Sequence, residues 1–202
     1  MRTETSNTTV ESIDAAVVRR WVLAAQTGDE AAYGELVKTY YQRVYGLLLG
    51  MVRRPEDAAD LAQQVWIKVW RKLHTFKGDA DFYTWVYRVA TFAGLDFIRK
   101  RNRQREVDWP DESQWPQDAA GHLTDNAVAR PDAAAVTEEV WASFDAALGT
   151  LSAEHRAALV LREVEGLSYD EIAKVMRCRR GTVMSRLYYA RRKIQEYMKD
   201  WR

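Results

Sequence analysis

The spacing of apolar side chains is the feature that most limits what this chain can fold into. They recur at intervals of three and four residues from about residue 15 to residue 105, and again from about residue 138 almost to the end. Such spacing gathers them on one face of an α-helix. Residues 106–137 lack this periodicity, hold three of the four prolines and are rich in acidic side chains. With no strand-like alternation, the sequence predicts an all-α protein: two small helical domains joined by an acidic, flexible linker.

A chain of 202 residues is long enough for two small domains, each with its own core. We therefore divide the sequence into a disordered tail (1–14), an N-terminal domain (15–105), the linker (106–137) and a C-terminal domain (138–202). In the N-terminal domain, Gly28 is predicted to end one helix and Asp29 to cap the next. The last two helices of that domain are expected from about residue 56 to 73 and from about 82 to 101.

Charge is distributed unevenly along the chain, although the net charge is only +1. Residues 1–105 carry 17 basic and 12 acidic side chains, residues 106–139 carry one and nine, and residues 140–202 carry 12 and eight. Two basic blocks therefore flank an acidic bridge. Both domains remain suited to a polyanionic partner.

Several classes of protein are disfavoured by the composition. No apolar stretch approaches the roughly 20 residues that span a bilayer, and the polar N-terminus does not resemble a signal peptide, so we expect no membrane insertion. The single Cys178 suits a reducing cytoplasm, and we interpret it as a packing residue in preference to a redox switch. His74, His122 and His155 are scattered. We predict no metal, no cofactor and no catalytic residues, hence no enzyme.

The C-terminal segment GLSYDEIAKVMRCRRGTVMSRLYYARRKI has the pattern of a helix-turn-helix. Ser168 and Glu171 form an S-x-x-E capping box that opens a short helix, and a tight turn over 177–179 follows. The second helix has a narrow apolar stripe made of Val183, Leu187, Ala190 and Ile194. A plain helical hairpin with a solvated basic face is the alternative.

The second helix exposes cations, hydroxyls and apolar groups opposite its stripe, as a recognition helix in a major groove does. Arginine can bond guanine, serine several base edges, and apolar groups the thymine methyl. The residues that we predict to contact duplex DNA are Arg179, Arg180, Thr182, Met184, Ser185, Arg186, Tyr188, Tyr189 and Arg192.

This segment resembles the promoter-binding C-terminal domain of extracytoplasmic-function (ECF) sigma factors of the sigma-70 family. The pieces GDEAAYGELVKTYYQRVYGLLLGMV, DAADLAQQVWIKVWRKL and FKGDADFYTWVYRVATFAGLDFIRKR resemble that family's N-terminal domain, in the same order. The resemblance covers roughly residues 15–105 and 138–198. It implies a non-catalytic subunit that binds core RNA polymerase and directs promoter-specific initiation. The recognition helix departs from the family pattern at Arg179, Arg180, Met184 and Tyr189, where we expect this chain's own −35 preference to arise.

By the same resemblance, the helix that follows Pro55 docks on the clamp coiled coil of polymerase. Asp57, Asp60, Gln63 and Gln64 are its predicted contacts. Gln64 stands where glutamate is common, so one carboxylate is missing from this face. The alternative is that the acidic residues only stabilise the positive end of the helix dipole.

The segment 76–105 interleaves aromatic and basic side chains, a combination that suits stacked bases and phosphates of single-stranded DNA. The resemblance implies that its helix and the loop over 76–84 capture the melted −10 strand and a flipped base. We predict as contacts Lys77, Phe82, Tyr83, Trp85, Arg88, Phe92, Arg99 and Arg101. The alternative, that the aromatics are core residues, is expected to hold for about half of them.

The resemblance also implies partners beyond DNA. The linker is either a solvated tether or a segment that threads through basic polymerase channels, and we favour threading. The C-terminal domain is expected on the flap of polymerase, and an anti-sigma factor is expected as a regulator. Two rival functions remain: a stand-alone helix-turn-helix regulator, and an anti-sigma-like adaptor that binds only proteins.

Overall fold

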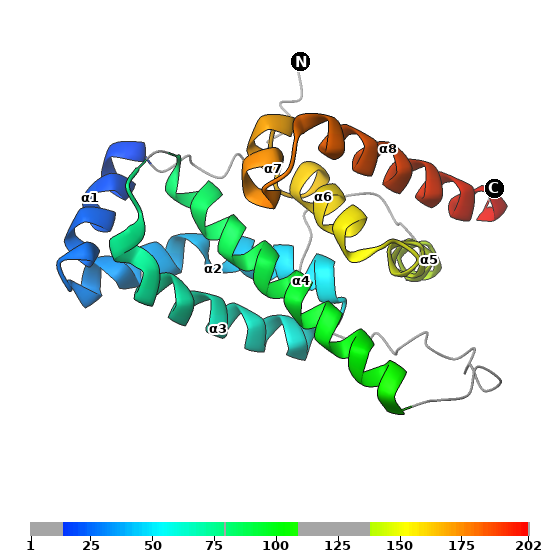
Figure 1. The fold of residues 1–202 in the computed structure, drawn as a ribbon, viewed down its shortest axis with the longest axis horizontal. Helices are drawn as coiled ribbons and strands as arrows, with labels where there is room; N and C mark the ends of the chain where they lie inside the picture. The colour runs from blue at the N-terminus through cyan, green and yellow to red at the C-terminus, as the bar shows by residue number, and fades with distance from the viewer. Residues whose placement is uncertain (1–13, 79, 109–137, 202) are drawn as a thin grey trace, which may run out of the picture.

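A computed structural model of the chain describes residues 14–78, 80–108 and 138–201, and every regular element in these ranges is helical (Figure 1). The N-terminal domain consists of α1 (Ala15–Gln26), α2 (Glu30–Val52), α3 (Pro55–Lys72), the 3-10 helix η1 (Leu73–Thr75) and α4 (Phe82–Asp108). The C-terminal domain consists of α5 (Glu138–Gly149), α6 (Ala153–Glu163), α7 (Tyr169–Met176), α8 (Arg180–Tyr197) and the 3-10 helix η2 (Met198–Trp201). The predicted all-α class is confirmed.

Local sequence signals set the helix boundaries of the N-terminal domain. Gly28 has a φ of 99°, a conformation that favours glycine, and lies between α1 and α2. The Asp29 side chain accepts a hydrogen bond from the Ala32 backbone N–H and caps α2, as predicted. Pro55 occupies the first turn of α3, where its missing N–H leaves no hydrogen bond unmade.

The buried faces of α3 and α8 are the ones that the apolar spacing predicts. In both helices, buried aliphatic side chains recur every three or four residues: Leu61, Val65 and Val69 in α3, and Val183, Leu187 and Ala190 in α8. Ile194 is partly buried against the same core. Both stripes are therefore confirmed.

The helix-turn-helix forms as the sequence indicates. The Ser168 side chain accepts from the Glu171 backbone N–H while the Glu171 carboxylate accepts from the Ser168 backbone N–H, which is a complete capping box at the start of α7. Arg177 ends α7 in the left-handed conformation, with φ 50°. Arg179 then precedes the first residue of α8.

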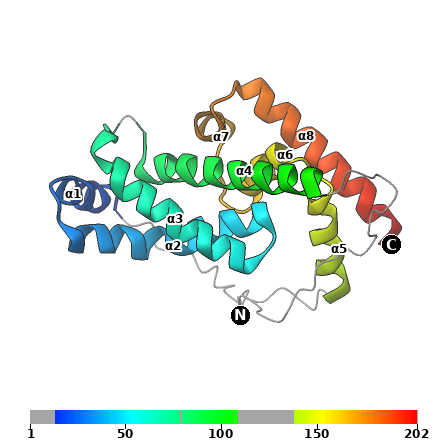
Figure 2. The same ribbon diagram turned by 60° about the horizontal axis from the view of Figure 1, so that its bottom comes forward.

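The two domains pack against each other over α2 and α4 (Figures 1 and 2). α7 lies against α4, and α6 lies against both α2 and α4, while α8 forms the side of the C-terminal domain away from α3. The buried residues of both domains join in one core. Gly50 of α2 allows this approach, because a Cβ there would meet the Cγ2 atom of Val160 in α6 at 2.8 Å.

A buried arginine joins the two domains at the same place. The Arg156 guanidinium of α6 donates to the carbonyl oxygen of Met51 in the last turn of α2 at 2.7 Å, and to that of Leu151 at 3.1 Å. Burial, together with the nearby Arg53 and Arg101, lowers the pKa of Arg156 to about 10. The cation thus satisfies a carbonyl that the end of α2 leaves without a helical partner.

Residues 1–13 of the predicted tail and 109–137 of the predicted linker lie outside the described residues, whereas Asp14, placed in the tail by the sequence, caps α1. α4 continues to Asp108, beyond the expected domain end at residue 105, since no proline interrupts the chain before Pro110. Within the described ranges, no helix combines the length and the apolar character needed to cross a membrane.

The capping box gives a stability prediction. Replacing Ser168 with alanine removes the acceptor for the Glu171 backbone N–H, and we expect a loss of about 1 kcal/mol. For a chain of this size, that lowers the midpoint of thermal unfolding by about 2–4 °C in calorimetry. The control is Ser185→Ala, an exposed serine inside α8 that caps no helix. An equal loss in both variants would contradict a specific role for the cap.

Candidate functional site

The outer face of α8 presents large side chains to solvent. Tyr188 and Tyr189 are 61% and 56% exposed, and Met184 is exposed as well. The rings of Tyr188 and Tyr189 contact each other edge to face, with centroids 5.5 Å apart. Ser185 is exposed beside them and donates a hydrogen bond to the Thr182 carbonyl. Aromatic, apolar and hydroxyl groups therefore form one surface on this helix, as the sequence analysis expects.

The cations of this domain differ in how freely they are presented. Arg179 is exposed at the start of α8. Arg180 forms an exposed ion pair with Asp170 at 3.6 Å, and Arg192 forms one with Glu196 at 2.8 Å. Such pairs are weak in water, so both guanidinium groups can exchange their partner for a phosphate.

Arg186 stands apart from the other predicted contacts. It is partly buried, and its guanidinium lies 3.8 Å from the Met176 sulfur and 3.6 Å from the Cys178 sulfur. Its position links α8 to the turn of the helix-turn-helix. Cys178 is partly buried in that turn, consistent with its interpretation as a packing residue.

His155 is a neighbour of this face that sequence reasoning missed. Its ring lies 6.3 Å from that of Tyr189, although it comes from α6. Burial and the nearby Arg186 lower the pKa of His155, so the ring is neutral over a wider range of pH. Nothing in the local pattern of α6 indicates this proximity.

α3 carries the predicted polymerase-binding residues on its solvent side. Asp60, Gln63 and Gln64 are exposed. Asp57 is different, because it is partly buried and its carboxylate contacts Arg101 of α4 at 3.3 Å and Arg54 at 3.8 Å. These ion pairs give Asp57 a role in fixing α4 to the start of α3.

Two apolar side chains extend this side of α3 and were not predicted. Ile67 is 53% exposed and Trp70 is 36% exposed, one and two turns beyond Gln63. The Trp70 ring lies against Tyr33 of α2, with centroids 4.7 Å apart. The sequence did contain a signal for this surface, because Ile67 and Trp70 are apolar residues that lie outside the buried stripe of Leu61, Val65 and Val69.

Two of the predicted strand-binding residues of α4 are buried in the structure. Phe82 and Trp85 are only 5% and 8% exposed. Phe82 packs against Tyr40 and Phe76, and Trp85 packs against Phe76, with ring centroids 5.4–5.7 Å apart. Both rings therefore belong chiefly to the core, although an edge of Trp85 reaches the groove described next.

A groove of about 460 Å³ runs between α3 and α4. It combines cations with aromatic rings, and its chief lining residues are Lys68, Lys72, Trp85, Arg88, Phe92 and Arg177. Arg88 and Phe92 were predicted as strand contacts. Lys68 and Lys72 were not, although their spacing of four residues places them on one side of α3.

The remaining predicted strand contacts lie close to the C-terminal domain or outside the groove. The Tyr83 hydroxyl donates to the Glu171 carboxylate, and burial together with this bond raises the pKa of Tyr83 to about 12. Arg99 donates to Glu154 at 3.0 Å. Lys77 is exposed in the loop before α4.

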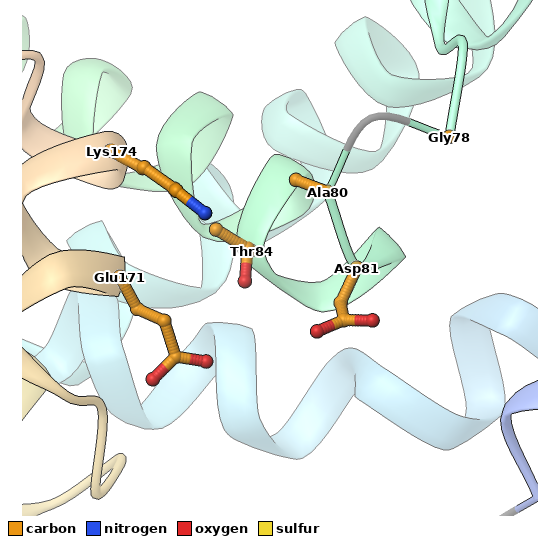
Figure 3. Close-up of a pocket in the computed structure, with 6 residues that line it drawn as sticks. All are labelled: Gly78, Ala80, Asp81, Thr84, Glu171 and Lys174. Carbon is orange, nitrogen blue, oxygen red and sulfur yellow. The ribbon is translucent and has the colours of Figure 1, made fainter.

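A second cavity, of about 300 Å³, lies where that loop meets α7 (Figure 3). Gly78, Ala80, Asp81 and Thr84 line it from the N-terminal domain, and Glu171 and Lys174 line it from the C-terminal domain. In Figure 3 the Glu171 and Lys174 side chains extend from α7 toward Thr84. The loop that was predicted to receive a base therefore borders the helix-turn-helix, although Lys77, Gly78 and Asp81 remain exposed.

Family models match both domains. The model of sigma-70 region 2 matches residues 36–104, and the model of sigma-70 region 4 matches residues 141–194. The two regions occur in the order that the sequence analysis expects and account for more than half of the chain.

Curated relatives match along most of their length. The chain is 37% identical to the RNA polymerase sigma-H factor of Pseudomonas aeruginosa, over 85% of this chain and 88% of that protein. It is 35% identical to the ECF RNA polymerase sigma-E factor of Haemophilus influenzae, over 90% and 93%. With the Escherichia coli K12 sigma-E factor it shares 34% identity, over 84% and 87%.

Solved structures share the fold. One is the sigma factor RpoE from Bartonella quintana, solved with the anti-sigma factor NepR; it covers 83% of this chain with a TM-score of 0.60 and 24% identity. Another is CnrH with the cytosolic domain of CnrY, which covers 91% of this chain with a TM-score of 0.64 and 20% identity. From the family matches and the curated relatives together, the chain belongs to the sigma-70 family of RNA polymerase sigma factors, in its ECF group.

Proposed function

We propose a division of labour within this sigma factor, which binds core RNA polymerase and directs promoter-specific initiation as members of its family do. In it, α3 holds the polymerase clamp, α8 reads the −35 duplex, and the groove between α3 and α4 captures the melted −10 strand. The observation that carries the proposal is the presence of three separate exposed faces with different chemistry. We infer a non-catalytic role, carried out in the cytoplasm where polymerase transcribes.

The face of α8 suits duplex DNA because it combines groups that read bases with cations at its edge. Ser185, Tyr188, Tyr189 and Met184 are exposed together and can reach base edges and thymine methyl groups. Arg179 lies just before the first residue of α8. When a recognition helix enters the major groove by its N-terminal end, a side chain at this position can contact a DNA phosphate. Arg186 is assigned to supporting the turn, since its guanidinium contacts two sulfur atoms there.

The face of α3 suits a protein partner because polar groups stand beside exposed apolar ones. Asp60, Gln63 and Gln64 supply charge and hydrogen bonds. Ile67 and Trp70 supply exposed apolar area, whose burial by a partner would be favourable. Aromatic side chains of this kind often carry much of the energy of an interface. A basic coiled coil complements the carboxylate of Asp60.

The groove between α3 and α4 suits a single strand. Phe92 and the edge of Trp85 offer ring surface for bases, and Lys68, Lys72 and Arg88 can neutralise phosphates along the same path. Asp96, at the end of the groove, is the one carboxylate among its lining residues. A duplex does not offer unstacked bases to such rings, so we assign this groove to the melted strand.

We also propose an anti-sigma factor as a regulator. RpoE of Bartonella quintana, which shares this fold, was solved with the anti-sigma factor NepR, and CnrH was solved with the cytosolic domain of CnrY. The exposed apolar residues of α3 are a surface that this partner and polymerase can compete for.

Transcription in vitro tests the assignment of α8. With core polymerase and a library of promoters, we expect the protein to direct RNA from promoters with a common −35 sequence. Replacing Ser185 and Tyr189 with alanine removes base contacts worth about 1–3 kcal/mol each, so the preference at the −35 positions should relax by tenfold or more. Unchanged −35 preference in the variant would overturn the assignment of this face. Absence of promoter-specific RNA from the parent protein would overturn the function as a whole.

Affinity for core polymerase tests the assignment of α3, because two substitutions of opposite charge effect should change that affinity in opposite directions. Gln64→Glu adds a carboxylate beside Asp60 and should tighten binding to core polymerase several-fold, and Asp60→Asn should weaken it by a similar factor. Both effects should shrink as salt is raised, because the charges are exposed. Titration of labelled protein with core enzyme measures the two affinities. Changes of the same sign in the two variants would contradict an electrostatic contact on this face.

The salt dependence of strand binding tests the groove. In the holoenzyme, replacing Lys72 and Arg88 with alanine removes two phosphate contacts, and the slope of log affinity against log salt should fall by about 1.4 for a −10 single strand. The control replaces Arg20 and Lys38, two exposed cations of α1 and α2 away from the groove. The groove is not the strand path if both double variants lower the slope equally.

A further inference from the structure

Gln26, the last residue of α1, binds backbone that lies 47 and 50 positions further along the chain. Its side-chain Nε2 donates to the carbonyl oxygen of Leu73 at 2.9 Å and to that of Phe76 at 2.8 Å. A glutamine amide has two N–H donors, so both are used. The two acceptors are the first residue of η1 and the residue that ends it. Gln26 therefore joins the two ends of η1 through one side chain.

α1 is a firm support for this contact because the helix is anchored in the core. Val18, Val22 and Ala25 are buried on its inner side. The helix packs along α2 and also lies against η1. Gln26 is partly buried, where water competes less for its hydrogen bonds. The amide therefore holds η1 against a helix that is itself fixed.

η1 contributes to the groove between α3 and α4. The lining residues of the groove include Lys72, which immediately precedes η1, and Thr75, its last residue. The two residues that Gln26 binds, Leu73 and Phe76, adjoin these lining residues in the chain. Gln26 itself is not one of the lining residues. Any effect that it has on the groove is therefore exerted through the backbone of η1.

Phe76 extends the same constraint to an aromatic ring of the groove. Its ring centroid lies 5.4 Å from that of Trp85 and 5.7 Å from that of Phe82. Trp85 is 8% exposed, and its edge lines the groove. A shift of the Phe76 backbone would move the ring against which Trp85 packs. The two hydrogen bonds of Gln26 therefore constrain a cation, a hydroxyl and an aromatic edge of the groove together.

The regular part of α3 does not depend on this contact. Lys68 lines the same groove one turn before Lys72, and the buried Val65 and Val69 fix its part of the helix. Lys72 is the last residue of α3, and the chain continues as a 3-10 helix, whose hydrogen bonds have poorer geometry. Gln26 should therefore affect the position of Lys72 and leave that of Lys68 unchanged.

We propose that Gln26 is a positioning residue for −10 strand capture. By holding both ends of η1, it keeps Lys72, Thr75 and the edge of Trp85 in the arrangement that meets the phosphates and bases of the strand. All of these contacts lie within the N-terminal domain. α1, which supplies none of the described lining residues of the groove, thereby supports strand binding. This inference rests on the proposed role of the groove between α3 and α4.

Removal of the two donors tests the proposal in the holoenzyme. Gln26→Met keeps an unbranched side chain of similar helix propensity but has no donor. We expect its affinity for a −10 single strand to fall about tenfold, because both hydrogen bonds that hold η1 are lost. The matched control is Gln42→Met, at an exposed glutamine of α2 that does not line the groove. The control should stay within about twofold of the parent.

A double-mutant cycle separates positioning from a simple loss of stability. In the parent, Lys72→Ala removes one phosphate contact and should weaken strand binding about fivefold at about 0.1 M salt. In the Gln26→Met background Lys72 is already displaced, so the same substitution should cost less than about twofold. Lys68→Ala should cost about fivefold in both backgrounds. A role confined to folding would not distinguish two lysines one turn apart.

A variant that restores donors tests whether the hydrogen bonds are the cause. Gln26→Lys places an ammonium group with three donors within reach of the same carbonyl oxygens. Its added charge attracts DNA in general, so its control is Gln42→Lys. The two lysine variants should bind the strand with affinities that agree within about twofold. An affinity of Gln26→Lys about tenfold below that of its control would overturn the proposal.

Holoenzyme formation is controlled separately. Affinity for core polymerase is measured first for every variant, and each strand titration is then made with the core enzyme saturated. The fraction of folded sigma factor therefore does not enter the comparison of strand affinities. Gln26→Met and Gln42→Met should bind core polymerase equally well, because neither residue lies on the face of α3 that we assign to the clamp.

The outcomes separate the role of Gln26 from the function on which it rests. If Lys72→Ala costs the same in both backgrounds while Lys68→Ala is also costly in both, the positioning role is overturned and the groove remains the strand path. If neither lysine substitution weakens strand binding in the parent, the assignment of the groove is wrong, and positioning at that groove is overturned with it.

Discussion

The packing of the aromatic side of α4 against α2 and the loop before it is the interaction on which the rest of the structure depends. Phe82 and Trp85 are buried by contacts with Tyr40 and Phe76, and their burial fixes the rotation of α4. That rotation turns Arg88 and Phe92 toward the cations of α3, which creates the basic groove. It also brings Tyr83 and Arg99 within reach of the C-terminal domain. One packing choice therefore sets both the basic groove and the contacts that α4 makes with the C-terminal domain.

Where a helix has a single apolar stripe, the sequence alone was enough to predict which face of the helix is buried. The buried faces of α3 and α8, the capping box at Ser168 and the break at Gly28 depend on residues that are near one another in the chain, so local periodicity and capping chemistry predict them. The exposed reading face of α8 follows from its stripe by elimination. The resemblance to the sigma-70 family added the roles of these faces, which periodicity does not contain.

α4 could not be resolved in this way, because aromatic residues occur on more than one of its sides. Which of them are buried depends on Tyr40 and Phe76, which other segments supply. Asp57 and Arg101 are a second example. The sequence predicted Asp57 as a polymerase contact and Arg101 as a DNA contact, but in the structure the two side chains pair with each other, 44 positions apart in the chain. Ion pairs and ring contacts between distant segments leave no periodic trace in the sequence.

The confusion between core and site on α4 has a physical cause. A face that stacks bases needs flat apolar rings beside cations, and a helical core needs the same rings. Rings on both kinds of face therefore have the same spacing and the same neighbours in the sequence. On α8 the two roles are separate, because the buried stripe is aliphatic and the exposed face carries the tyrosines, so the sequence alone distinguishes them.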